Sequence, residues 1–337
     1  MTLTIRDVAD AAGVSQATAG RALGGYGAVS PAALERVLAA ADRLGYRTNR
    51  VAQALRSGQT RTVGFIPGDL ENPFFAKIAR HLGDSLEAEG FTLIVSSSDE
   101  RPEREQKIIE TFRAHLLSGI VIAPTAQVAA PHLEKVIRDA IPLVLIDRRI
   151  AGLDADSVTV DNEGGGYQAV AHLVELGHRR IAIVSDSLQI VSTSERFIGY
   201  QKALADHQIP FDPQLLGVSG SSREDAYAST MRILDLGDRP TAIFTTDTFM
   251  TEGSLRAIRE RGLVVPADIS IVGFDDVDPR SLMNPSVTVV AQPIAELGQQ
   301  AARLLLEQLA GVEREPQHVD LVAELIVRDS TGPAPVR

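Results

Sequence analysis

The segment "TIRDVADAAGVSQATAGRAL" (residues 4–23) determines how the N-terminal part of the chain folds. Its first threonine, followed three residues later by Asp7, has the pattern of a helix N-cap with a carboxylate at the third helical position. This pattern predicts a helix from Ile5 to about Ala12, which Gly13 ends. The short turn that follows predicts a second helix packed directly against the first.

Two further helices are predicted downstream. Ser15 caps the first of them, from Gln16 to Leu23, where the interior Gly20 costs about 0.5–1 kcal/mol relative to alanine. The other begins at Ser30-Pro31 and ends at Leu44, before a glycine. The first two helices carry apolar residues at spacings that let them cross tightly: Val8, Ala9, Ala12, Val14, Ala19 and Leu23. We interpret the segment as a helix-turn-helix bundle, with a small helical interaction module as the alternative.

Charge is unevenly distributed along the chain. The net charge is -11, yet residues 1–60 hold seven arginines against four acidic side chains, which gives +3. The remainder holds 26 basic and 40 acidic residues, which gives -14. A basic segment attached to an acidic body is the pattern expected when a small domain meets phosphates and the bulk stays away from them.

A linker follows the bundle in "YRTNRVAQALRSGQTRT" (residues 46–62). Asn49 caps a short helical stretch from Arg50 to Ser57, and Gly58 interrupts it. A helix of about eight residues is too short to be stable alone, so a partner or DNA must fold it.

Composition excludes several classes of protein. The 337 residues are 44% hydrophobic and include no cysteine, which excludes disulfides, thiol nucleophiles and cysteine-ligated zinc. The start "MTLTIRDVAD" has no apolar core of a signal peptide, and the uncharged stretch at 116–133 is interrupted by polar residues and prolines. We therefore expect a cytoplasmic protein without a membrane partner.

From residue 61 onward, predicted strands alternate with amphipathic helices such as Phe74 to Ala88 and Ala295 to Leu309. This alternation is typical of parallel sheets with helices on both faces. About 275 residues are too many for one such sheet, so we expect two lobes with a ligand cleft at the carboxyl ends of the strands. The predicted strands are "TVGFIP", "FTLIVSS", "GIVIAP", "PLVLID", "SVTV", "RRIAIV", "TAIFTT", "ISIVGF", "SVTVVAQ" and "AELIVRD".

Polar and aromatic residues at the ends of these strands are the candidates for a ligand site. Arginine, aspartate and hydroxyl groups that converge beside an aromatic face suit a sugar, because each sugar hydroxyl needs both a donor and an acceptor. Structural ion pairs are the alternative for Asp147, Arg148 and Asp161. The candidates are Asn72, Phe75, Asp147, Arg148, Asp161, Ser192, Arg196, Thr246, Asp247, Asp275 and Gln292.

Several motifs, taken in order, resemble the lactose and galactose repressor family. They are "TIRDVADAAGVSQATAGRAL", "VSPAALERVLAAADRLGYRTNRVAQALRSGQTRTVGFI", "NPFF", "LGHRRIAIV", "ERFIGYQKAL", "ADISIVGFDD" and "VTVVAQPIAELG". The resemblance implies an N-terminal all-α helix-turn-helix DNA-binding domain and an α/β two-lobed core like that of periplasmic binding proteins, with two doubly wound parallel sheets. It also implies a regulator, with repression as the expected mode, whose operator affinity is set by a small effector.

The implied domains are a DNA-binding domain at 1–48, a hinge helix and linker at 49–60, and an effector-binding and dimerisation core at 61–337. Within the core we expect an N-lobe at about 61–160 and 291–322 and a C-lobe at about 161–290 and 323–337. Because one such domain reads one half-site, a homodimer on a pseudo-palindromic double-stranded operator is expected. Family tetramers carry a leucine-heptad tail, whereas this sequence ends "RDSTGPAPVR".

The resemblance assigns DNA contacts residue by residue. Gln16, Ala17 and Arg21 take the positions that face the major groove, where glutamine suits adenine, arginine suits guanine and alanine admits a thymine methyl. Arg21 as a phosphate clamp is the alternative, and Ser15 and Thr18 are expected as cap and phosphate contacts. The hinge positions that enter the minor groove, with leucine as the wedge, are Asn49, Val51, Ala52, Leu55 and Arg56.

The same resemblance ranks Phe75, Asp147, Ser192, Arg196, Thr246 and Asp275 as the strongest effector contacts. Ile190 and Ser221 replace a polar or basic residue and an aromatic residue of certain relatives. This replacement disfavours a planar purine held between two rings, so carbohydrate is the expected effector class. A regulator that responds to a nucleoside or sugar phosphate remains an alternative, and induction and corepression both remain open.

No enzyme signature is present. The pair Asp275-Asp276 lies on a strand, where neighbouring side chains point to opposite faces. The run "NEGGGYQA" fits neither the dinucleotide nor the phosphate-loop spacing, so close helix packing is the better interpretation. The seven histidines lack metal-ligand spacing, and no cofactor is expected. A sugar-binding protein without a DNA role is the remaining alternative.

Overall fold

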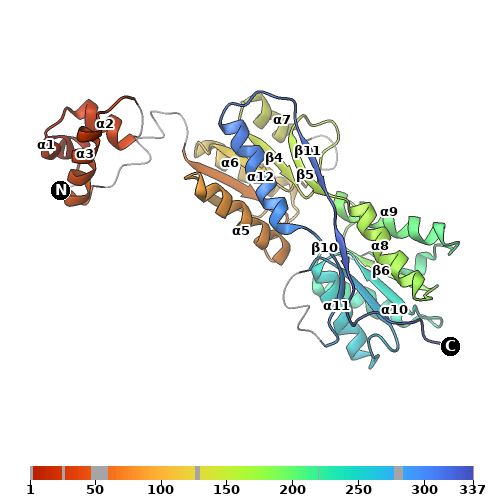
Figure 1. Cartoon of the computed structure of the whole chain (residues 1–337). Coiled ribbons are helices and arrows are strands. Elements are labelled where there is room, and N and C mark those ends of the chain that lie inside the picture. The colour runs from red at the N-terminus through yellow and green to blue at the C-terminus, as the bar shows by residue number, and fades with distance from the viewer. Residues whose placement is uncertain are drawn as a thin grey trace. The chain divides into compact units, whose positions relative to one another are not determined.

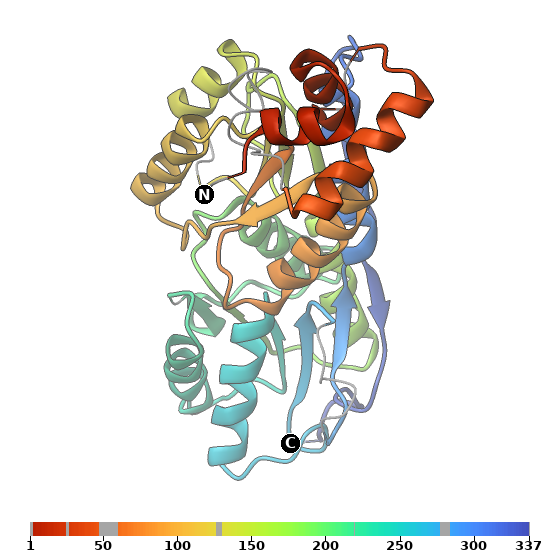
Figure 2. The same ribbon diagram turned by 90° about the vertical axis from the view of Figure 1, so that its left-hand side faces the viewer.

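The computed structural model describes residues 3–24, 27–46, 60–125, 130–218, 220–276 and 284–336. The chain divides into two compact units, of which the smaller holds the first three helices and the larger holds both sheets. Figures 1 and 2 show the elements of each unit in two views.

The small unit is a three-helix bundle. Its helices are α1 (Ile5–Ala12), α2 (Gln16–Gly24) and α3 (Pro31–Leu44). Thr4 and Asp7 form the predicted capping box, and Gly13 ends α1 with φ 63°. The Ser30 side chain accepts a hydrogen bond from the backbone of α3. All three predicted helices are confirmed, with α2 one residue longer than expected.

The core of this bundle is built from small side chains. Alanines let the helix backbones approach closely, and Gly20 is buried among them. The face of α2 that carries Ala19 and Gly20 therefore packs into the bundle. The buried core consists of Val8, Ala9, Ala12, Ala19, Ala22, Val37, Ala40 and Ala41.

The first lobe of the larger unit contains a parallel sheet in the order β11-β5-β4-β3-β1-β2. Strands β3, β4 and β5 are buried throughout, and β3 and β4 have the continuous apolar sequence that such burial favours. The strands are β1 (Thr62–Ile66), β2 (Thr92–Val95), β3 (Gly119–Ile122), β4 (Leu143–Ile146), β5 (Asp156–Val160) and β11 (His318–Leu321). The helices are α5 (Pro73–Ala88), α6 (Pro102–Ala114), α7 (Pro131–Arg138) and α12 (Ile294–Leu309).

The second lobe repeats this arrangement in the order β12-β10-β9-β8-β6-β7. Its strands are parallel except β12, which runs antiparallel to β10. The strands are β6 (Ile181–Ser185), β7 (Leu216–Val218), β8 (Ala242–Thr245), β9 (Ser270–Phe274), β10 (Thr288–Ala291) and β12 (Glu324–Ile326). The helices are α8 (Asn162–Glu175), α9 (Val191–Asp206), α10 (Arg223–Leu234) and α11 (Thr248–Glu260), with a 3₁₀ turn at Pro213–Leu215.

The sequence prediction missed two strands. β7 has only three residues, and β11 reads "HVDL", with one fully buried apolar residue and two exposed polar ones. Both lack the apolar run that marked the central strands. The prediction of two lobes is confirmed: the chain passes between them after β5, after β10 and after β11 (Figure 1).

Helices α8 and α9 pack backbone to backbone at glycines. A side-chain carbon on Gly166 would collide with the carbonyl of Arg196, and one on Gly199 would lie 2.7 Å from the Tyr167 nitrogen. The expectation that "NEGGGYQA" serves close helix packing is confirmed. In the described parts of the chain, no helix is long and apolar enough to span a membrane.

Candidate functional site

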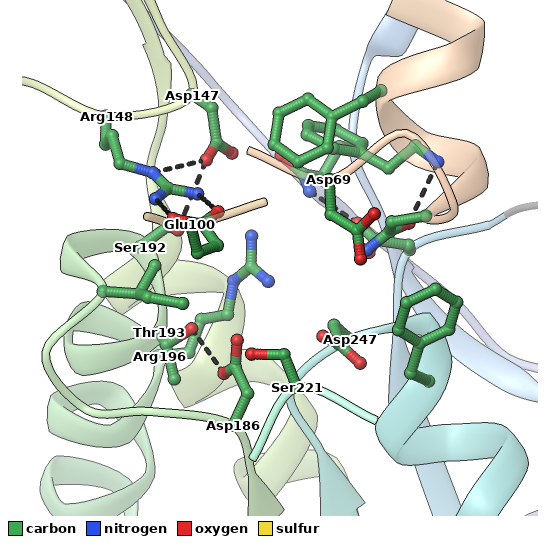
Figure 3. A pocket seen from close by; sticks show the side chains of 17 residues that line it. Asp69, Glu100, Asp147, Arg148, Asp186, Ser192, Thr193, Arg196, Ser221 and Asp247 are labelled. Carbon is green, nitrogen blue, oxygen red and sulfur yellow. Dashed lines mark hydrogen bonds and ion pairs between the residues drawn. The ribbon is translucent and has the colours of Figure 1, made fainter. Parts of the chain in front are cut away.

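A cavity lies at the carboxyl ends of the strands in the larger unit, lined by residues of both lobes (Figure 3). It has about 490 Å³ of empty volume, open solvent included. Its lining comprises Asp69, Asn72, Phe74, Phe75, Glu100, Asp147, Arg148, Asp186, Ile190, Ser192, Thr193, Arg196, Ser221, Asp247, Phe249, Asp275 and Gln292.

Arg148, two residues beyond the end of β4, is the centre of the first lobe's contribution. Its guanidinium donates to both carboxylate oxygens of Glu100, at 2.8 and 3.0 Å, and to Asp147 at 3.0 Å. Burial lowers the pKa of Arg148, but the charges of Glu100 and Asp147 outweigh it, so the pKa rises above its usual range. This ion-paired group is rigid and always charged.

Arg196 on α9 is the second buried cation of the cavity, only 4% exposed. It donates to the Asn162 side chain at 2.9 Å and to the Thr246 carbonyl at 2.6 Å. Its guanidinium also lies 3.7 Å from the centre of the Phe274 ring. Because its contacts hold it with neutral groups, its positive charge stays available to the cavity.

Asp147 and Asp275 are held in an unusual backbone conformation. Their φ angles are 71° and 75°, in the left-handed region that non-glycine residues rarely adopt. Gln292, after β10, donates to Asp275 at 2.5 Å. The neighbouring Asp276 instead pairs with Arg328 at 2.7 Å, outside the cavity lining. The two adjacent aspartates thus take different partners, but the expectation that they lie on a strand is wrong, because β9 ends at Phe274 and Asp275 has a left-handed φ.

Asp186 and Asp247 follow the adjacent strands β6 and β8. Asp186 accepts from the Thr193 hydroxyl at 2.7 Å, and Asp247 caps α11 by accepting from the Met250 N–H at 2.7 Å. Burial raises the pKa of Asp186 to about 6, and burial together with the charge of Asp186 raises the pKa of Asp247 to about 7.

The structure brings nine of the eleven expected effector residues to this cavity: Asn72, Phe75, Asp147, Arg148, Ser192, Arg196, Asp247, Asp275 and Gln292. Two are not in its lining. Asp161 caps α8, where its carboxylate accepts from the Gly164 N–H at 2.8 Å. Thr246 is buried next to the cavity, and it acts on Arg196 through its carbonyl. Both positions immediately follow the strand ends, which is why the sequence alone could not separate them from lining residues.

Six lining residues were not expected: Asp69, Phe74, Glu100, Asp186, Thr193 and Phe249. Asp186 has the same signal as Asp147, a carboxylate directly after a buried strand, and could have been found by it. Glu100 lies further along a loop, and its role depends on Arg148, which is distant in sequence.

The candidate nucleic-acid interface is the exposed side of α2. Gln16, Ala17 and Arg21 are exposed, and Arg21 donates to the Thr18 hydroxyl at 3.4 Å. The Ser15 hydroxyl accepts from the Thr18 N–H at 3.1 Å, so Ser15 is the expected cap. The hinge candidates Asn49, Val51, Ala52, Leu55 and Arg56 lie outside the described residues.

Residues 4–49 match the family model "bacterial regulatory proteins, lacI family", and residues 170–331 match a periplasmic binding protein-like domain. Catabolite control protein A of Priestia megaterium is 32% identical, over 98% of this chain and 100% of that protein. The chain belongs to the lacI family. It is a transcriptional regulator with a helix-turn-helix DNA-binding domain and a periplasmic-binding-protein-like core.

Two solved structures of lacI family proteins are similar along most of the chain. The lac repressor dimer bound to operator and the anti-inducer ONPF is 30% identical, with a TM-score of 0.86, and covers 98% of this chain and 100% of that chain. A lacI family regulator from Enterococcus faecium with bound ribose is 31% identical, with a TM-score of 0.74, and covers 81% of this chain and 99% of that chain.

Proposed function

We propose that this regulator is a repressor that acts as a homodimer in the cytoplasm. Residues 1–48 bind an operator half-site, with Gln16, Ala17 and Arg21 reading bases, and residues 49–60 form the hinge. Residues 61–337 dimerise and bind the effector. The operator-bound dimer of the lac repressor supports this assignment, because the similarity extends across both units. The assignment gives the cavity a regulatory role and no catalytic one.

A small carbohydrate is the effector that the cavity supports best. The observation that carries this proposal is the set of fixed donors and acceptors in one cavity: Arg196, Asp275, Gln292 and Asp147, beside the ring of Phe75. Sugar hydroxyls need both kinds of partner. The ribose bound by the Enterococcus faecium relative is consistent with this class.

Control of operator affinity follows from the origin of the lining residues. Phe75 and Arg148 belong to the first lobe, and Arg196 and Asp275 belong to the second. A ligand that contacts both lobes stabilises one arrangement of them over another. The coupling to DNA can be no larger than the ligand's difference in affinity for the two states.

A nucleoside or sugar phosphate is the second candidate. Among the described residues, six carboxylates and two guanidinium groups line the cavity, and this excess of negative charge disfavours a phosphate. Ile190 and Ser221, which line the cavity, supply no ring for stacking a base. Both features favour the carbohydrate over this alternative.

Two substitutions in the full-length chain test the division of labour. Arg21→Ala is expected to abolish specific operator binding and leave ligand-induced thermal shifts unchanged. Arg196→Met is expected to retain operator binding and lose the response to sugars. A panel of sugars, polyols, sugar phosphates and nucleosides supplies the ligands, and light scattering measures the mass of the dimer.

Two outcomes would contradict the proposal. One is operator binding that survives Arg21→Ala, and the other is a thermal shift that only phosphorylated ligands produce.

A further inference from the structure

The cavity contains more negative charge than its own cations neutralise. Of its two arginines, Arg148 is shared between Glu100 and Asp147. Asp186 and Asp247 receive their hydrogen bonds from neutral donors, the Thr193 hydroxyl and the Met250 N–H. Among the described residues, Arg196 is the cation that lowers the pKa of both, and its donors are directed to Asn162 and a carbonyl.

Strand register brings these two carboxylates together. β6 and β8 are parallel neighbours with Val184 opposite Thr245, and the chain continues with a hydrogen bond from the Thr246 N–H to the Val184 carbonyl. Asp186 and Asp247 each lie two residues beyond this register pair. Adjacent strands lie about 4.8 Å apart, so the two side chains leave the sheet side by side.

Both carboxylates point into the cavity (Figure 3). Asp186 is 6% exposed and Asp247 is 9% exposed. Each uses one oxygen, Oδ1, for its protein hydrogen bond and has its second oxygen free for a ligand. Two buried carboxylates side by side are costly when both are ionised. Either protons or a cationic ligand must relieve that cost.

We propose that the effector carries a positively charged amino group, bound between Asp186 and Asp247, and belongs to the amino sugars or amino polyols. This inference rests on the proposed carbohydrate effector and narrows its class. The ammonium donates three hydrogen bonds and neutralises the carboxylates, and such charge-assisted bonds are about twice as strong as neutral ones. The hydroxyls of the ligand bind Arg196, Asp275 and Gln292.

The titration of the two carboxylates is consistent with this arrangement. The pKa of Asp186 is raised to about 6 and that of Asp247 to about 7, with burial as the main cause. The charge of Arg196 lowers the pKa of both carboxylates, and that of Arg148 lowers the pKa of Asp186. Glu100 raises the pKa of Asp186, and Asp275 raises that of Asp247. An ammonium that enters the site replaces bound protons, whereas a neutral sugar binds beside them.

Matched pairs of ligands test the inference on the full-length protein. Isothermal titration at pH 7.0 compares glucose with glucosamine, galactose with galactosamine, and sorbitol with 1-amino-1-deoxysorbitol. At least one amino member is expected to bind ten times or more tighter than its neutral parent. N-acetylglucosamine, which is uncharged, is expected to bind no better than glucose.

Asparagine substitutions of the two aspartates test whether their charge, rather than their shape, binds the amino group of the ligand. Asp247→Asn keeps an oxygen that can accept from the Met250 N–H, and Asp186→Asn keeps one for the Thr193 hydroxyl. Each is expected to weaken binding of the amino ligand at least tenfold and to change that of its neutral parent less than threefold. Asp206→Asn removes an exposed charge from the same lobe, outside the cavity lining, and is the matched control.

The outcomes distinguish this inference from the function on which it rests. Neutral sugars that bind as tightly as their amino counterparts, or amino binding that survives both asparagine variants, overturn the charged effector and leave the carbohydrate regulator in place. If no sugar or polyol binds and a nucleoside or a phosphorylated ligand does, both the amino effector and the proposed carbohydrate effector are overturned.

Discussion

The helix-turn-helix unit and the ligand cavity are specified by the sequence in opposite ways. In the bundle, the start of each helix is fixed by residues within three positions of it, as with Thr4 and Asp7 or Ser30 and Ala33. In the cavity, the contacts join positions far apart in sequence, as between Glu100 and Arg148 or Asp275 and Gln292. Because its contacts are local, the bundle can be predicted from a short segment of sequence. The cavity can be predicted only when the fold of the whole core is known.

The difference also appears in strain and charge. The positive φ angles of the bundle lie on glycines, such as Gly13 and Gly45, where they cost little. In the cavity they lie on Glu100, Asp147 and Asp275, and buried carboxylates adjoin them. Such costs persist only where the surrounding fold imposes them, which is typical of functional sites. Substitutions at the two regions should therefore differ in size and even in sign.

The largest effect is expected where the core's long-range packing is disturbed. Gly166→Val places a branched side chain against the Arg196 carbonyl, between α8 and α9. Because backbone cannot move aside as a flexible side chain can, we expect a loss of about 3 kcal/mol or more in the stability of the core. Arg196 shifts with α9, so ligand binding should be lost as well. Chemical denaturation and ligand titration measure the two effects.

The matched control is Gly237→Val, because nothing lies within 4 Å of a side-chain carbon at that position. This variant should change stability by less than about 0.5 kcal/mol. Equal losses at the two glycines would mean that the helix contact between α8 and α9 does not limit stability.

These glycines illustrate how much the sequence could predict. The run "NEGGGYQA" indicated close packing, but the sequence did not show that Gly199 is its partner. That contact appears only when α9 is placed beside α8. Strands such as β3 were predicted from their apolar runs, and the cap residues from their spacing. Glu100 was missed because the residues next to it in sequence do not indicate that it pairs with Arg148. Asp161 and Asp147 both follow strands, and only the fold shows that one caps a helix and the other lines the cavity.

Neutralising a cavity carboxylate is expected to raise the stability of the core, in contrast to the loss expected for Gly166→Val. The pKa of Asp247 is raised from 3.8 to about 7, mainly by burial. Between about pH 4 and pH 7 the folded state therefore holds a proton that the unfolded state has released, so stability falls as the pH rises through this window. Asp247→Asn removes this loss and should stabilise the ligand-free core by about 2 kcal/mol at pH 8 relative to pH 5.

Urea titrations of both proteins at pH 5 and pH 8 measure the difference, with Asp206→Asn as the control for surface charge. A variant whose change in stability is the same at both pH values would show that the Asp247 carboxylate is not the group responsible. The expected gain in stability, with loss of amino-ligand binding, is the trade-off typical of a binding site.

A local cap in the bundle should produce a smaller loss. The Ser30 hydroxyl accepts from the Ala33 N–H at the start of α3. Ser30→Ala leaves this N–H without its side-chain partner and should destabilise the bundle by about 1 kcal/mol, with no change in ligand binding. Circular dichroism of the thermal transition measures it, and Ser30→Asp, which can restore the cap, is the matched rescue. Failure of aspartate to recover stability would contradict a capping role.

The smallest effect is expected at Gly20, a buried glycine inside α2. Glycine inside a helix costs about 0.5–1 kcal/mol relative to alanine, yet Gly20 is buried in the bundle. We expect Gly20→Ser to stabilise α2 and to tighten operator binding a few-fold, measured by fluorescence anisotropy with non-operator DNA as the control. Raised helicity with unchanged operator affinity would contradict the prediction. It would mean that α2 is already ordered enough without DNA, and that the exposed residues Gln16, Ala17 and Arg21 alone set affinity. Lowered helicity would mean that the bundle's core has no space for the serine side chain, and that packing outweighs local propensity even in this locally specified unit.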